Sequence, residues 1–142
     1  RARLARAATE DAASFARVME ARRLPQRTED EKRERINKVE EALKGAAIIP
    51  LEVAGIAVQV LELLETLSEI GNPNALSDAA TGAQLILAAV TAARYNVLVN
   101  IIDIEDEEFA SEHRARAGDL LERAREITVR IETSLMESIG GE

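Results

Sequence analysis

Asp11 is a carboxylate set in the apolar pattern of the first predicted helix. At helical spacing it shares one face with Leu4, Ala8, Phe15 and Val18. A carboxylate on an apolar face loses hydration, so it must bind a partner or have its pKa raised. A carboxyl group with a raised pKa suits general acid–base catalysis near neutral pH. The alternative is that the stripe ends at the surface and Asp11 is solvated at its edge. Because buried acids are scarce, the pattern by itself favours this alternative.

Polar residues gather at two further places along the chain. The segment GNPNALSD contains Asn72, Asn74 and Asp78, and further on Asn96 and Asn100 lie one helical turn apart. Asparagine amides both donate and accept hydrogen bonds, so they suit a ligand with an alternating polar edge. GNPNALSD is equally well explained as a turn followed by a helix N-cap.

Other reactive residue types are scarce. The absence of cysteine excludes disulfides, thiolate metal sites and cysteine nucleophiles. His113, the only histidine, lies on an apolar helical stripe and is expected to be a packed residue rather than a ligand. The acids at 105–108 begin a predicted helix, where the helix dipole explains them without a metal. We therefore predict no metal site.

Composition indicates one all-helical domain over residues 1–142. Hydrophobic residues make up 46% of the chain, aromatics only 2%, which is typical of closely packed helices rich in alanine and leucine. The net charge of −8, with no basic patch, argues against a nucleic-acid partner. Apolar windows are interrupted by Glu or Gln, so we predict a soluble, cytoplasmic protein without a membrane segment.

The helix signals predict an antiparallel bundle of about five long helices. Leu24-Pro25 ends the first helix near Arg22, and Thr28 with Glu31 forms a capping box for the second. Pro50 either kinks this helix or begins the next. The remaining helices are expected over 51–70, 75–101 and 106–139, and Gly71 is expected to cap the first of these.

The segment 51–70 is predicted to be buried on most of its circumference. Its polar positions form one narrow line, and nearly all others are aliphatic. That line consists of Glu52, Gly55, Gln59, Glu62, Thr66 and Glu69.

Taken in order, four segments resemble the formiminotetrahydrofolate cyclodeaminase / methenyltetrahydrofolate cyclohydrolase family, the family of the C-terminal domain of formiminotransferase-cyclodeaminase. The segments are RLP, IIPLEVA, GNPNALSD and YNVLVNIIDIEDEEF. The resemblance implies an all-helical homodimer that acts on a tetrahydrofolate derivative. It implies ring closure of 5-formiminotetrahydrofolate to 5,10-methenyltetrahydrofolate with release of ammonia, or, as in some relatives, hydrolysis of the methenyl bridge.

The resemblance also implies roles for individual residues. The catalytic aspartate of the family lies in a DAxxF stretch before the RLP turn, which corresponds here to Asp11 and Phe15. One carboxyl group suffices if it carries a proton from N10 to the departing nitrogen. The folate would then contact the polar residues of the later segments and an arginine of the RLP turn, namely Asn72, Asn74, Asp78, Asn96, Asn100 and Arg23. The alternative from another class is a non-catalytic helical oligomerisation module.

A homodimer also follows from geometry. Asp78 and Asn96 are 18 residues apart on one predicted helix, and therefore about 27 Å apart along its axis. If this helix packs antiparallel on a two-fold copy of itself, Asp78 of one chain approaches Asn96 of the other.

The chain departs from the family pattern at its start. It begins at Arg1 within a helical pattern, whereas relatives begin with a glycine-rich turn and an alanine-rich helix. We therefore expect that segment to be missing or supplied by a separate chain.

Overall fold

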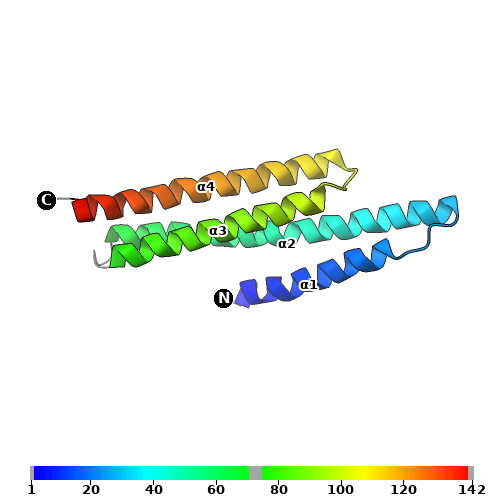
Figure 1. Cartoon of the computed structure of the whole chain (residues 1–142), viewed down its shortest axis with the longest axis horizontal. Helices are drawn as coiled ribbons and strands as arrows, with labels where there is room; N and C mark the ends of the chain where they lie inside the picture. The colour runs from blue at the N-terminus through cyan, green and yellow to red at the C-terminus, as the bar shows by residue number, and fades with distance from the viewer. Residues whose placement is uncertain (1, 71–74, 141–142) are drawn as a thin grey trace.

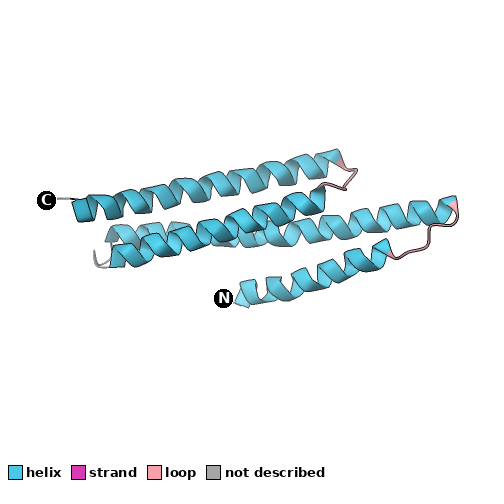
Figure 2. Cartoon of the chain, in the orientation of Figure 1, coloured by secondary structure: helices cyan, strands magenta, loops and turns pink. Residues whose placement is uncertain are grey.

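The computed structural model describes residues 2–70 and 75–140, which form four α-helices. The helices are α1 (Ala2–Arg22), α2 (Glu29–Ile70), α3 (Leu76–Ile101) and α4 (Glu107–Gly140). Helices α2, α3 and α4 pack on one another as an elongated bundle, and α1 packs on α2 (Figure 1). Figure 2 shows only helices and connecting loops in the described ranges. The all-α prediction is confirmed.

The prediction of five helices is wrong, because α2 continues through Pro50 as one helix of 42 residues. Proline lacks the N–H that would bond the carbonyl four residues earlier, here that of Ala46. The side-chain amide of Asn100 on α3 donates to that carbonyl instead, with an Nδ2–O distance of 3.3 Å. The Ala46 carbonyl therefore keeps a hydrogen-bond donor, and α2 continues where a break was expected.

The predicted helix starts agree with the structure to within a residue or two. The capping box is present, since the Glu31 N–H donates to Thr28 Oγ1 at 3.2 Å and the Thr28 N–H donates to Glu31 Oε2 at 3.0 Å. Asp106 caps α4 by accepting the Phe109 N–H at Oδ1, 3.0 Å away. The predicted cap at Gly71 lies outside the described residues.

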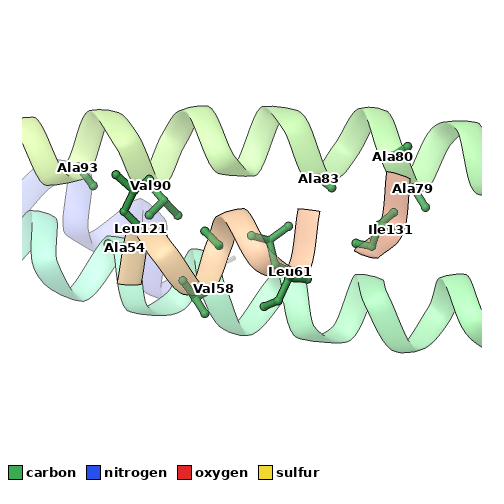
Figure 3. Packing of buried hydrophobic residues seen from close by; sticks show 12 residues of the cluster. Ala54, Val58, Leu61, Ala79, Ala80, Ala83, Val90, Ala93, Leu121 and Ile131 are labelled. Atoms are coloured by element: carbon green, nitrogen blue, oxygen red, sulfur yellow. The ribbon is translucent and has the colours of Figure 1, made fainter. Parts of the chain in front are cut away.

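Two clusters of buried side chains hold the bundle together. The larger cluster joins α2, α3 and α4 around Leu61, Val90 and Ile131, none of which has measurable exposure (Figure 3). The smaller cluster joins α1 to the other helices through Val18 and Leu43. Alanines such as Ala83 and Ala124 let the helices approach closely, as the composition suggests.

The second half of α2 is less buried than predicted. Leu63 is 66% exposed and Leu67 is 59% exposed. Leu63 borders the polar line, one turn after Gln59, whereas Leu67 lies farther from it. Neither side chain belongs to the two core clusters, so this sector of the apolar surface of α2 is not covered by the described core. The prediction of burial around most of its circumference is wrong for the single chain.

Helices α2 and α3 each contain a stretch long and apolar enough to cross a membrane by length and composition. Both helices contribute core residues to the bundle, and core helices of soluble proteins pass the same test.

Candidate functional site

Helix α1 buries a different face from the one that the sequence pattern indicates. The residues buried against α2 are Ala7, Ser14, Val18 and Ala21. Of the predicted stripe only Val18 is buried, whereas Leu4 is 42% and Phe15 is 66% exposed. The stripe therefore lies mostly at the surface, and Asp11 is exposed, as in the alternative that the pattern by itself favours.

Asp11 is exposed on α1, one turn before Phe15. Its main-chain carbonyl accepts the Ser14 hydroxyl at 2.8 Å. Within residues 2–70 and 75–140, its carboxylate forms no hydrogen bond or ion pair. The carboxylate is thus open to a ligand, beside an exposed aromatic ring that offers a flat apolar surface.

Asp78 lies in the first turn of α3, at the opposite end of that helix from Asn96. It lines an open cavity of about 380 Å³ whose other walls include Leu64, Leu67 and Leu76. A largely apolar hollow with one carboxylate suits a flat ring that carries N–H donors. The predicted residues Asn72 and Asn74 lie outside the described residues.

Asn96 and Asn100 lie near the C-terminal end of α3. Asn96 is exposed, whereas Asn100 is half-buried. The Nδ2 of Asn100 donates to the carbonyls of Ala46, at 3.3 Å, and of Asn96, at 2.9 Å. Only its Oδ1 is left for a ligand.

Arg23 follows α1 directly and is exposed. Its neighbour Arg22 pairs with Asp103, Nη2 to Oδ2 at 3.2 Å, which joins the end of α1 to the α3–α4 connection. Arg23 therefore lies toward the same end of the bundle as Asn100. Asp78 lies at the other end, about 27 Å from Asn96 along α3. A single chain does not bring the two groups together.

His113 is a packed residue, as predicted. Its ring stacks on that of Phe109, with centroids 3.7 Å apart and planes inclined by 20°. Its Nδ1 lies 2.9 Å from the Phe109 carbonyl oxygen. Because a carbonyl only accepts, Nδ1 must carry the proton in this contact.

Sequence reasoning missed a cluster formed by Glu40, Lys44 and Asp106. Lys44 Nζ lies 2.7 Å from Asp106 Oδ2 and 3.1 Å from Glu40 Oε1. The hydrogen bonds to Asp106 and then Glu40 raise the pKa of Lys44. The hydrogen bond from Lys44, followed by that from the Phe109 N–H, lowers the pKa of Asp106. Lys44 and Asp106 are 62 residues apart, so the sequence shows only that Asp106 lies at the start of a predicted helix.

The described part of the chain has no group of three or more His, Cys, Asp or Glu residues placed to hold a metal ion.

Arg94 carries a buried hydrogen-bond donor. Within the described residues its Nε has no hydrogen-bond partner.

Comparisons with known proteins converge on one family. The family model described as formiminotransferase-cyclodeaminase matches residues 1–119. The chain is 36% identical over 122 residues to a methenyltetrahydrofolate cyclohydrolase of Methylorubrum extorquens, covering 86% of this chain and 59% of that protein. It is 34% identical over 115 residues to a formimidoyltransferase-cyclodeaminase of Rattus norvegicus, covering 81% of this chain and 21% of that protein.

A solved structure agrees. The crystal structure of a formiminotetrahydrofolate cyclodeaminase from Thermotoga maritima superposes with a TM-score of 0.83 at 28% sequence identity, covering 98% of this chain and 65% of that chain. The chain thus spans less than two thirds of the length of these relatives.

Proposed function

Because the chain belongs to the formiminotransferase-cyclodeaminase family, we propose that it acts in folate one-carbon chemistry. The proposed reaction closes 5-formiminotetrahydrofolate to 5,10-methenyltetrahydrofolate and releases ammonia. The observation that carries the proposal is the family match together with Asp11, whose carboxylate is open to a ligand and has no partner within the described ranges.

Asp11 is the proposed proton carrier. Starting from the protonated formimino group, N10 adds to its carbon and forms the new C–N10 bond. The Asp11 carboxylate takes the proton that N10 then carries, and gives it to the nitrogen of the former imine. The bond between the carbon and this former imine nitrogen breaks, ammonia leaves, and the positive charge remains on the methenyl bridge. One proton moves through one carboxyl group, so a second acid is not required.

The remaining predicted contacts belong to this proposal. The pterin would be hydrogen-bonded by four amides and one carboxylate, those of Asn72, Asn74, Asn96, Asn100 and Asp78. Arg23 would face the anionic glutamate of folate. The apolar cavity beside Asp78 supports the first of these roles. Folate is the proposed substrate, and no metal is invoked.

A two-fold dimer would complete the site. Six exposed residues of α3 and its C-cap recur at alternating spacings of three and four, which is the pattern of a helix–helix seam. The seam consists of Leu85, Ala88, Ala92, Tyr95, Val99 and Ile102. An antiparallel copy that brings Asp78 to Asn96 of the partner subunit would place the two-fold axis at the height of residue 87, beside Leu85 and Ala88 of the seam. The neighbouring alanines would allow a close approach there.

The test is ammonia release from 5-formiminotetrahydrofolate by purified protein carrying Asp11→Asn. We expect the rate to fall about 10²–10⁴-fold while the helical circular dichroism is unchanged. Glu10→Gln is the matched control, because Glu10 is an exposed acid on the same helix and should retain the parent rate. An Asp11→Asn protein as active as its parent would remove Asp11 from the mechanism.

The second candidate is methenyltetrahydrofolate cyclohydrolase, which the name of the 36% identical relative favours. If the protein causes methenyltetrahydrofolate absorbance to decay but releases no ammonia from 5-formiminotetrahydrofolate, it is a cyclohydrolase. A chain that neither turns over nor binds either folate would instead act as a helical oligomerisation module.

A further inference from the structure

Pro50 creates a defect in the buried part of α2. It lies inside a continuous helix and cannot donate a hydrogen bond to the carbonyl of Ala46. Ala46 is only 4% exposed and belongs to the smaller core cluster, so water has little access to it. A buried carbonyl without a donor is destabilising, and something in the fold must replace the missing N–H.

Asn100 is placed to do so. It lies on α3 between Val97 and Ile101, two members of the same core cluster that Ala46 joins. Its Nδ2 approaches the Ala46 carbonyl to 3.3 Å, and the same nitrogen donates to the Asn96 carbonyl of its own helix at 2.9 Å. Two N–H groups thus serve two carbonyls, one on each helix.

We propose that the Asn100 amide replaces the hydrogen bond that Pro50 cannot make, so that the two residues act as one structural unit joining α2 to α3. The amide holds α2 continuous across the proline. It also fixes the register of the Pro50 segment against the C-terminal part of α3. This role is independent of the proposed folate chemistry, and it leaves Oδ1 of Asn100 free.

A double-mutant cycle between Asn100→Ala and Pro50→Ala tests the unit in the full chain. Pro50→Ala restores the main-chain N–H, so the Ala46 carbonyl no longer depends on Asn100. We expect Asn100→Ala to lower the melting temperature by about 3–9 °C in the parent, as for one buried acceptor left unpaired in a domain of this size. In the Pro50→Ala background the same substitution should lower it by less than half as much.

Thr91→Val is the matched control. The Thr91 hydroxyl bonds only the Leu87 carbonyl of its own helix, at 2.8 Å, so its removal should have the same effect in both backgrounds. Equal losses for Asn100→Ala in both backgrounds would overturn the proposal, as would no loss in the parent. If Asn100→Ala alone does not fold, folding of the double variant supports the unit, and failure of both refutes it.

Discussion

The packing of α2 beyond Pro50 makes a sharp prediction about two leucines that lie two residues apart. Leu61 is fully buried in the larger cluster, whereas Leu63 is 66% exposed. Leu61→Ala removes three buried carbons, worth about 2.4 kcal/mol of transfer free energy, and leaves a cavity. We expect a loss of about 3–4 kcal/mol in the free energy of unfolding. Leu63→Ala removes the same atoms from a largely hydrated position and should cost less than about 1 kcal/mol.

The assay is urea unfolding followed by circular dichroism at fixed protein concentration. A fall in the midpoint at unchanged slope reports stability alone. Leu63→Ala serves as the matched control, because it makes the same chemical change on the same helix. If the two variants lose equal stability, or Leu63→Ala loses more, then α2 is turned about its axis after Pro50. Such a rotation would accompany the helix break that the sequence suggests.

Two further predictions concern charge and assembly. The pKa of Asp106 is lowered in the folded chain from its ordinary value of 3.8, so its pairing with Lys44 stabilises the fold at any pH above 3.8. This stabilisation is lost as the pH falls from 3.8 through the lower pKa of the folded state. Asp106→Asn, which keeps a cap, should therefore flatten the dependence of the urea midpoint on pH in acid, and an unchanged dependence would refute this cause. On the α3 seam, Val99→Glu should shift the chain toward the monomer in sedimentation. Val129→Glu on α4, which is also exposed, should leave the dimer intact. If the two variants sediment alike, the dimer does not form through the α3 seam.

Local signals in the sequence predict the helices well. The Thr28–Glu31 box needs only residues three apart. The apolar stripe that carries His113 continues along α4 through Ala117, Ile127 and Ile131, all of which are buried. These features depend on neighbours within one helix. Helical spacing is therefore sufficient to find them.

The errors arise where the deciding partner is distant in sequence. Pro50 reads as a break because nothing near it shows that Asn100, 54 residues after Ala46, will supply the donor. The buried face of α1 differs from the predicted one because α1 packs mainly on α2, whose own surface selects the face. For the candidate site, the sequence shows both the residue types and the separation of Asp78 from Asn96 along one helix. It does not show that the Asn100 amide nitrogen is already used by the Ala46 carbonyl of α2.

The polar residues of this fold divide into two kinds, and the division bears on function. The two fully buried polar side chains have partners within their own helices: the Thr128 hydroxyl donates to the Ala124 carbonyl at 2.8 Å, and the Ser14 hydroxyl donates to the Asp11 carbonyl at 2.8 Å. The buried Nε of Arg94 is the exception among the described residues. The carboxylates of Asp11 and Asp78, in contrast, are exposed and have no partner within the described residues. A side chain that stabilises the fold should be satisfied by the fold, whereas a side chain that binds a ligand must be left unsatisfied until the ligand arrives. Under the proposed function the exposed carboxylate of Asp11 is left available for proton transfer, whereas the amide nitrogen of Asn100 is used by the fold.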